Sequence, residues 1–107
     1  MAKGEKIVVL VTCGTRVQAK KIAQRLVEER LAACVNVIAS PLESIYRWKG
    51  KVERAKEFLL IIKTSRARFD ALRERIQKLH SYNTPEVIAL QIVAGSREYL
   101  EWIETST

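Results

Sequence analysis

The residues best suited to chemistry lie between positions 80 and 86. This segment, His80-Ser-Tyr-Asn-Thr-Pro-Glu86, contains the only histidine of the chain together with a tyrosine and a carboxylate. An apolar stretch that begins at Val87 follows it directly. Because a proline and the residue before it cannot continue a helix, the segment is predicted to be a loop. If the chain has a chemical site, we expect it here.

Imidazole, thiolate and carboxylate groups are common metal ligands, and a metal site needs three or four of them. His80, Cys13 and Glu86 are therefore the candidate metal ligands, and a thiolate with an imidazole would suit copper. Each residue also has a structural interpretation. A loop histidine is often held by hydrogen bonds, a cysteine often acts as a small buried apolar residue, and Glu86 could anchor the loop.

The N-terminal part of the chain predicts a strand followed by a helix. Residues 7–11 form a continuous run of apolar, mostly β-branched side chains, as expected of a strand that is covered on both faces. Thr15 is the expected N-cap, with Gln18 three residues later in the register of a capping box. Apolar residues then recur at helical spacing to about residue 30.

The middle of the chain predicts one unusually long β-hairpin. Its arms run out from Cys34 and back to Thr64, with a turn at Gly50. Pro41 in the first arm marks an edge or a bulge, since proline cannot donate to a central ladder. Residues 58–62 are a second apolar run, and we expect them to be buried on both faces.

The C-terminal part predicts a helix, a strand and a short helix. Apolar residues spaced as on one helix face occur from Phe69 to Leu79, the strand is expected at residues 87–93, and a cap at Ser96 begins the last helix. The resulting order, β-α-β-β-α-β with an added helix, is that of the ferredoxin-like α/β sandwich. At 107 residues the chain is predicted to form this one domain over residues 1–107.

In this topology the end of the first strand, the hairpin tip and the start of the last strand meet at one edge of the sheet. Cys13, Trp48 and Glu86 are therefore expected at that edge, with Cys34 and Lys63 at the other. At ~3.3 Å per residue the two cysteines would be about 15 Å apart, beyond the ~7 Å limit for a disulfide. Both are predicted to be free thiols, which is typical of a reducing compartment.

The hairpin arms are longer than the other predicted strands, so their outer halves extend beyond what a small domain can cover. A two-stranded ribbon is marginal alone in water, and exposed edges with aromatic residues favour pairing with another chain. We therefore expect an oligomer. Tyr46, Trp48 and Tyr82 could line a cleft between subunits and stack on a ligand, with Lys63 of a neighbouring copy binding an anion. Packing in the subunit seam is the alternative role for the aromatic residues.

Composition argues against several classes of function. The chain has 19 Lys and Arg residues against 12 Asp and Glu, a net charge of +7, but the basic residues are scattered as on a solvated surface. The central strands lack the exposed aromatic residues of RNA-recognition modules, so no nucleic-acid partner is predicted. No nucleophile–base pair, Gly-rich nucleotide loop or CxxC motif occurs, and no enzymatic activity is expected. The first apolar run is too short for a signal peptide or a membrane span, which predicts a cytoplasmic protein.

Five motifs in register resemble the CutA family of divalent-cation tolerance proteins. They span nearly the whole chain and read Leu31-Ala-Ala-Cys-Val-Asn36, Ser44-Ile-Tyr-Arg-Trp-Lys-Gly-Lys51, Leu59-Leu-Ile-Ile-Lys-Thr64, His80-x-Tyr-x-x-Pro-Glu86 and Tyr99-Leu-x-Trp-Ile103. The resemblance implies a ferredoxin-like subunit in a tight homotrimer whose long hairpins exchange edges, similar to the nitrogen-regulatory PII signalling proteins. It also implies a link to copper tolerance, with Cu(II) or another divalent cation as the candidate ligand and no cofactor required.

The chain departs from the family pattern at the loop. Ser81 replaces the usual proline after the histidine, and Asn83 stands where an acidic residue is common. Copper ligation in the family has been attributed to a loop histidine and to a strand-one cysteine, whose position is Val11 here; a second histidine of some members would be Leu79. Of that set only His80 remains. The alternative function is a PII-like sensor of a small ligand, or an adaptor, with a cleft between subunits.

Overall fold

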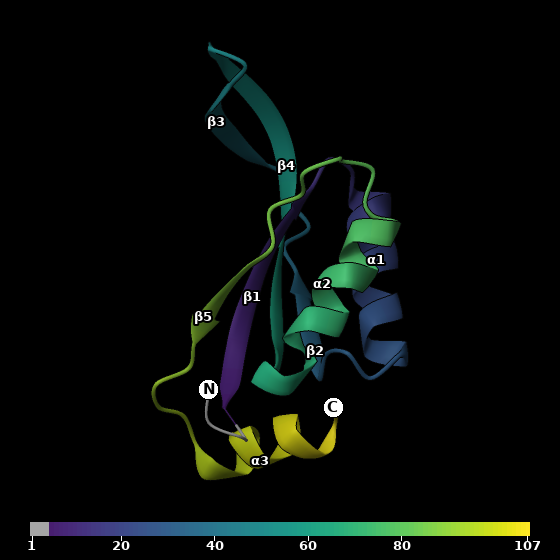
Figure 1. The fold of residues 1–107 in the computed structure, drawn as a ribbon, viewed down its shortest axis with the longest axis vertical. Coiled ribbons are helices and arrows are strands. Elements are labelled where there is room, and N and C mark those ends of the chain that lie inside the picture. Colours follow the sequence, from purple (N-terminus) through teal and green to yellow (C-terminus); the bar gives the residue numbers. More distant parts are fainter. Residues whose placement is uncertain (1–4) are drawn as a thin grey trace.

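Residues 5–107, the part of the chain that the computed structural model describes, have the predicted ferredoxin-like order of elements (Figure 1). In chain order these are β1 (Lys6–Cys13), α1 (Arg16–Glu28), β2 (Cys34–Val37), β3 (Leu42–Trp48), β4 (Lys51–Ser65), the 3₁₀ helix η1 (Arg66–Arg68), α2 (Phe69–Leu79), β5 (Ile88–Gln91) and α3 (Arg97–Thr105). The first hairpin arm is divided into β2 and β3, and α3 is the predicted additional helix.

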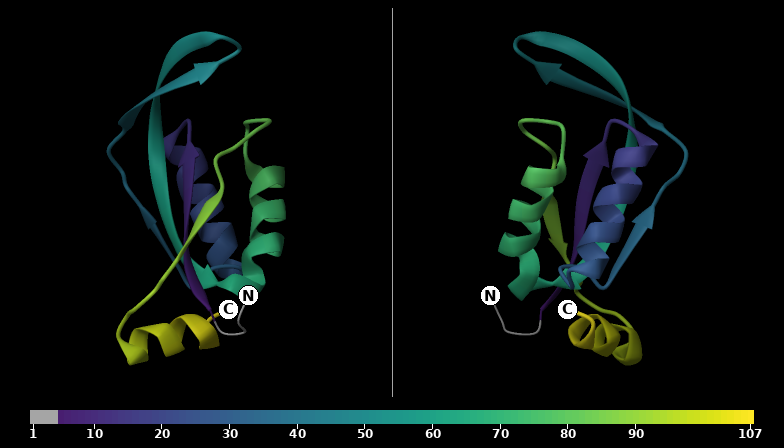
Figure 2. Two further views of the ribbon diagram at one scale, coloured as in Figure 1. Left: turned by 60° about the vertical axis from the view of Figure 1, so that its left-hand side comes forward. Right: turned by 90° about the vertical axis from the view of Figure 1, so that its right-hand side faces the viewer.

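The strands form one antiparallel sheet with the order β2-β4-β1-β5, and β3 pairs with the outer part of β4. β1 pairs with β4 from Lys6–Ser65 to Cys13–Phe58. Helices α1 and α2 both lie against the same face of this sheet, and α3 lies near its end, away from the hairpin (Figures 1 and 2). The fold therefore has two layers, with helices on one side only.

Alternation along the strands determines which side chains enter the core between the sheet and the helices. On β1 the buried residues of this face are Ile7, Val9, Val11 and Cys13, and Leu60 and Ile62 lie beside Val11 and Val9 on β4. The helices complete the core with apolar faces that consist of Ala19, Ile22 and Leu26 from α1 and of Leu72 and Ile76 from α2. The helical periodicity predicted for both segments is confirmed.

Residues 5–107 leave the opposite face of the sheet open. Burial of residues 7–11 and 58–62 on both faces, predicted from their continuous apolar runs, is wrong for the single chain. Ile61 on β4 is only partly buried, and Ile88 and Leu90 on β5 are half exposed. A continuous apolar run is typical of a strand with apolar neighbours on both sides. Within residues 5–107 the helices cover only one face of the sheet. The apolar layer on the other face is therefore expected to come from another chain.

Helix α1 begins where the sequence predicts and ends before the expected residue 30. Thr15 is the N-cap, and its hydroxyl oxygen accepts a hydrogen bond from the backbone N–H of Gln18 at 3.1 Å. The helix stops at Glu28 because Arg30 adopts a left-handed backbone conformation with φ 58°. The Arg30 side chain then donates from Nη2 to the carbonyl oxygen of Thr105 at 2.9 Å, which ties this end of α1 to α3.

The predicted long hairpin is confirmed, and its tip projects beyond the rest of the molecule (Figure 1). β4 has 15 residues, and its outer part pairs with β3 alone. Pro41 lies in the interruption between β2 and β3, as expected for a residue that cannot donate to a ladder. Arg16 holds this interruption, because its Nη2 donates to the carbonyl of Ala39 at 3.1 Å and its guanidinium lies 6.0 Å from the ring centre of Phe58.

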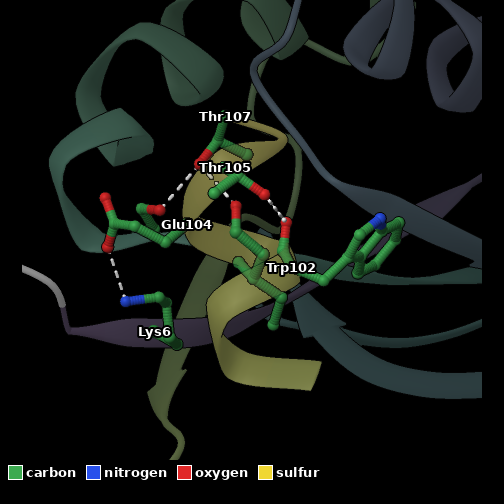
Figure 3. A network of polar contacts seen from close by, with 7 residues as sticks. Lys6, Trp102, Glu104, Thr105 and Thr107 are labelled. Carbon is green, nitrogen blue, oxygen red and sulfur yellow. Dashed lines mark hydrogen bonds and ion pairs between the residues drawn. The ribbon is translucent and has the colours of Figure 1, made fainter. Parts of the chain in front are cut away.

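Helix α3 is held against the end of the sheet by one buried side chain and a small polar network (Figure 3). Ile103 is fully buried. Lys6 Nζ forms an ion pair with Glu104 at 2.6 Å, and the Thr107 hydroxyl donates to the carbonyl of Ile103 at 2.9 Å and lies 2.7 Å from Ser65 Oγ. Apolar burial supplies most of the stability at this contact, because an ion pair with an exposed partner contributes little.

The last strand is shorter than the predicted range 87–93. β5 covers Ile88–Gln91, opposite residues 7–10 of β1. The backbone N–H of Ile92 still donates to the carbonyl of Lys6 at 3.0 Å. Because β1 begins at Lys6, the chain beyond Ile92 has no further partner on β1 and cannot continue the ladder.

The predicted positions of the cysteines are confirmed. Cys13 ends β1 near the base of the hairpin, where it pairs with Phe58. Cys34 pairs with Lys63 toward the other end of β4. Both cysteines are free thiols.

The hairpin turn provides a test of the backbone geometry. Lys49 (φ 50°) and Gly50 (φ 79°) are both left-handed, which defines a type I′ turn, where Asn-Gly is strongly preferred. We expect Lys49→Asn to raise the free energy of unfolding by roughly 0.5 kcal/mol, and Lys49→Val, whose branched side chain tolerates this region poorly, to lower it by about 1 kcal/mol. Urea denaturation measures both. Equal stability of the three proteins would contradict this turn geometry.

Candidate functional site

A cavity of about 620 Å³ opens where the hairpin faces the loop at residues 80–86. Its wall combines residues of β1, β3, β4 and the loop, namely Thr12, Ser44, Ile45, Tyr46, Trp48, Glu57, Tyr82, Asn83, Thr84 and Glu86. The fold thus brings Tyr46, Trp48, Tyr82 and Glu86, all selected from the sequence, to one site. Glu57 is the one charged residue of this wall that was not among the candidates predicted from the sequence.

Strand alternation directs these side chains to the open side of the sheet. Along β4, Glu57 is two and four residues from Leu59 and Ile61, so it lies on the same side as they do. On β3, Tyr46 pairs with Glu53 and Trp48 with Lys51, which also places both aromatic residues on this side of the ribbon. The hairpin therefore extends the open face of the sheet, and the cavity lies on this extension.

His80 fastens the loop to the end of β1. It is buried, with 7% of its surface exposed. Its Nε2 lies 2.7 Å from the carbonyl oxygen of Thr12, which can only accept, so Nε2 carries the proton. Its Nδ1 accepts a hydrogen bond from the backbone N–H of Tyr82 at 3.1 Å. Both ring nitrogens of a neutral imidazole are therefore used within the protein, and the ring lies 4.5 Å from that of Tyr82.

Tyr82 joins the loop to the hairpin. Its hydroxyl donates to Glu57 Oε2 at 2.9 Å. Burial of the phenol, together with the hydrogen bond to the Glu57 carboxylate and its charge, raises the pKa of Tyr82 to about 12. Gly14 permits this approach, since a Cβ at that position would lie only 3.1 Å from the Tyr82 hydroxyl. The phenol is thus held between the end of β1 and the side chain of Glu57.

Glu57 is a carboxylate with 8% of its surface exposed, and no cationic side chain within residues 5–107 forms an ion pair with it. Buried carboxylates are normally paired or extensively hydrogen-bonded. Glu86 lines the same cavity, and its partial burial, together with the charge of Glu57, raises the pKa of Glu86. The two carboxylates therefore share one electrostatic environment, in which a cation would be stabilised.

Cys13 lies beneath the site as part of the hydrophobic core. Burial of the thiol, with a smaller contribution from the charge of Glu57, raises the pKa of Cys13 to about 11. The thiolate is the form that binds metals. At neutral pH Cys13 is consequently a protonated core residue.

Comparison with known proteins reveals the relatives of this fold. Residues 7–106 match the family model described as CutA1 divalent ion tolerance protein. The chain belongs to the CutA1 family. The family resemblance and the ferredoxin-like fold expected from the sequence are thereby confirmed.

Relatives and solved structures of the CutA1 family agree with this assignment. The divalent-cation tolerance protein CutA of Thermus thermophilus is 50% identical over 100 residues, which cover 94% of this chain and 96% of the relative. The chloroplastic CutA protein of Arabidopsis thaliana is 50% identical over 101 residues, covering 94% of this chain but only 55% of the relative. The Cut A1 structure from T. thermophilus has a TM-score of 0.93 at 49% identity over 95% of this chain and 98% of that chain. The CutA1 structure from Oryza sativa has a TM-score of 0.94 at 46% identity, and the match covers 98% of this chain and 95% of that chain.

The predicted metal ligands lie at the same end of this CutA1-family chain but do not form a ready ligand cluster. Cys13 is in the core, His80 is fully hydrogen-bonded, and Glu86 lines the cavity. Within residues 5–107 there is no group of three or more His, Cys, Asp or Glu side chains placed to hold a metal ion. Metal binding by these three residues stays a prediction.

Lys63, the predicted anion-binding residue, is not in the cavity of its own chain. It lies opposite Val8 and Cys34, and its Nζ donates to the side-chain oxygen of Asn36. The described wall of the cavity contains two carboxylates and no Lys, Arg or His. Its charge therefore favours a cation, and an anion site completed by Lys63 of a neighbouring copy stays a prediction.

Glu57 is a site residue that was not predicted from the sequence, although the sequence contains a signal for it. Glu57 directly precedes the apolar run at residues 58–62 and occupies the same alternating positions as Leu59 and Ile61. A charged residue on the apolar side of a predicted strand is costly unless it has a function or a partner. A charge in phase with the apolar residues Leu59 and Ile61 therefore marks Glu57 as a candidate site residue.

The role of His80 can be tested by stability. We expect His80→Ala to lower the free energy of unfolding by about 1–3 kcal/mol, because the variant leaves the Thr12 carbonyl and the Tyr82 N–H without their partner. Ser81→Ala is the matched control, since it removes only an exposed 3.2 Å bond to Gln18. Urea denaturation compares them. If both variants were as stable as the wild type, His80 would not fasten the loop.

The pKa of Tyr82 predicts a dependence on alkaline pH. Because its folded-state pKa of about 12 exceeds the ordinary value of 10.0, folding favours the neutral phenol. This contribution to stability is complete below the ordinary pKa and is lost as the pH rises through the folded-state pKa. An ultraviolet titration of tyrosinate should show that Tyr82→Phe removes a step near pH 12. Loss of a step near the ordinary tyrosine pKa would contradict the Glu57–Tyr82 contact.

Proposed function

We propose that this CutA1-family protein takes part in tolerance of, or response to, divalent cations by binding the cation as a homotrimer without catalysing a reaction. The observation that carries the proposal is the carboxylate of Glu57, which is buried beside a cavity shared with Glu86 and has no ion-pair partner within residues 5–107. A bound cation would compensate this charge. Relatives that carry the name divalent-cation tolerance protein support the same function.

The carboxylates fit a divalent cation better than the imidazole and the thiol do. Within residues 5–107, Tyr82 bonds only one oxygen of Glu57, and Glu86 is accessible from the cavity. Carboxylate oxygens can hold Cu(II) or a harder divalent cation, with water or a neighbouring subunit completing the coordination. Ligation by Cys13 would require ionisation of a buried thiol, and ligation by His80 would break a hydrogen bond of the loop. We therefore assign ligation to Glu57 and Glu86.

The open face of the sheet supports assembly of several subunits. Apolar side chains from three strands meet on this face, namely Val8, Leu10, Leu59, Ile61, Ile88 and Leu90. Monomeric proteins rarely expose so continuous an apolar surface, and the projecting hairpin adds the unpaired outer edge of β3. Other copies of the chain would cover both features. The number of three subunits follows from the family resemblance.

A cytoplasmic location is part of the proposal. The two free cysteines are typical of a reducing compartment. None of the helices within residues 5–107 has the length and apolar character needed to cross a membrane. Named locations differ among relatives, since one is called chloroplastic and a structure from Archaeoglobus fulgidus is called periplasmic.

A sensor of a small organic ligand, in the manner of the PII proteins, is the second candidate function. The observation that favours it is the size of the cavity, about 620 Å³. A metal ion with a few waters would occupy only a part of that space, since one water takes ~30 Å³.

The assembly can be tested at the centre of the open face. We expect Ile61→Glu to convert a trimer into monomers, because it would bury a charge without a partner at the interface. Val17→Glu is the matched control, since Val17 is 78% exposed on α1, on the helical side of the sheet. Native mass spectrometry gives the subunit number. A monomeric wild type, or a trimeric Ile61→Glu variant, would overturn the proposed assembly.

The ligand assignment can be tested by native mass spectrometry with Cu(II). The wild type should take up copper stoichiometrically, Glu57→Gln and Glu86→Gln should lose it, and the exposed Glu98→Gln on α3 should retain it. Folded His80→Ala should also retain copper, since His80 holds the loop and is not assigned as a ligand. Loss of copper in His80→Ala alone would move the site to the histidine. Absence of copper from the wild type would refute the proposed cation site.

A further inference from the structure

The cavity has room for more than a metal ion. Its volume of about 620 Å³ lies within the ~300–1,000 Å³ typical of sites for small organic molecules. An inorganic cation at Glu57 and Glu86 would leave most of this space to solvent. A ligand that fills the cavity must therefore have an organic body as well as a group that matches the wall.

The charge of the wall selects a cationic group. Glu57 and Glu86 are its only acidic side chains, and among the described residues no basic side chain lines it. The charge of Glu57 contributes to the raised pKa of Tyr82, Glu86 and Cys13, which belong to different elements of the fold. Its field thus extends across the site without a neutralising partner. An anionic group would be repelled, and a neutral group would leave the field uncompensated.

Three aromatic residues form a further part of the wall. Tyr46 and Trp48 come from β3, and Tyr82 comes from the loop. Both hairpin aromatics are exposed despite their large apolar surface. The faces of such rings are electronegative and attract ammonium groups, and the attraction is greatest for tryptophan. Rings beside carboxylates are the combination that recognises an organic cation.

We propose that the cleft formed by Tyr46, Trp48, Tyr82, Glu57 and Glu86 binds an organic ammonium ion. The cationic head lies at the two carboxylates, and the aliphatic body lies against the rings. The inference rests on the proposed function in one respect, which is that the same carboxylates serve both kinds of cation. An organic ammonium ion and a divalent metal ion therefore compete for the site.

Choline and butylamine are suitable probes, and dimethylbutanol, the uncharged carbon isostere of choline, is the matched control ligand. Calorimetric titration of the purified assembled protein should show saturable binding of both ammonium ions and none of the alcohol. Trp102→Phe leaves Trp48 as the only tryptophan, since the chain contains 2. Quenching of its fluorescence by choline then locates the ligand at the hairpin.

Substitutions separate the contributions of charge and ring. Glu57→Gln and Glu86→Gln should each weaken binding of both ammonium ions by about tenfold or more. Trp48→Leu should weaken binding of choline, and Glu98→Gln on α3 should leave it unchanged. Because Glu86 is exposed at the rim, its variant tests the charge even if Glu57→Gln fails to fold.

The outcomes distinguish this inference from the proposed function. Dimethylbutanol binding as tightly as choline, or an unaltered affinity in Glu86→Gln, would overturn the ammonium site. Copper uptake without choline binding would refute only the organic ligand, and choline binding without copper uptake would refute only the metal function. Weaker choline binding after addition of Cu(II) is the result expected of shared carboxylates. If choline and Cu(II) bound without affecting each other's affinity, the shared site would be overturned.

Discussion

The antiparallel ladder between β1 and β4 is the constraint on which the rest of the structure depends. It runs from Lys6–Ser65 to Cys13–Phe58, where β1 ends, while β4 continues outward to Lys51. β1 has 8 residues and β4 has 15, so the outer part of β4 loses its neighbour on that side. The first residue beyond the ladder is Glu57, which pairs with Leu42 of β3 and accepts a hydrogen bond from Tyr82 of the loop, where β1 no longer lies beside β4. The site exists because two paired strands differ in length.

The carboxylate at this boundary lowers the stability of the fold, and the neighbouring residues limit the loss. A buried carboxylate with a single hydrogen bond is less favourable than a paired one. Tyr82 donates that hydrogen bond, and His80 uses both ring nitrogens to hold the loop on which Tyr82 lies. The histidine therefore has a positioning role. It holds the loop so that Tyr82 stays beside Glu57 and the cavity stays open. Uncompensated charges in rigid surroundings are typical of functional sites.

Local signals in the sequence predicted the elements, and long-range contacts limited what could be predicted of the site. The cap at Thr15 and the break at Pro85 depend on neighbouring residues and are confirmed. The partner of His80 is the carbonyl of Thr12, 68 positions away, and no spacing in the sequence reveals that contact. Burial of Glu57 depends on where β1 ends. The apolar runs predicted a sheet that is buried on both faces. The sequence does not say whether the second face is buried by the same chain or by another one.

The open sheet face and the cavity are continuous, so the proposed assembly and the proposed ligand binding would affect each other. Leu59 and Ile61 lie on the same side of β4 as Glu57, so a copy of the chain that covered them would lie close to the carboxylate. A ligand that binds only the assembled form stabilises it by mass action. In the proposed assembly a neighbouring subunit would in turn change the solvation of Glu57, and hence the affinity for a cation. In the proposed assembly, one buried charge at the border of the interface would therefore be sufficient to connect cation concentration with assembly, without any element that has to move.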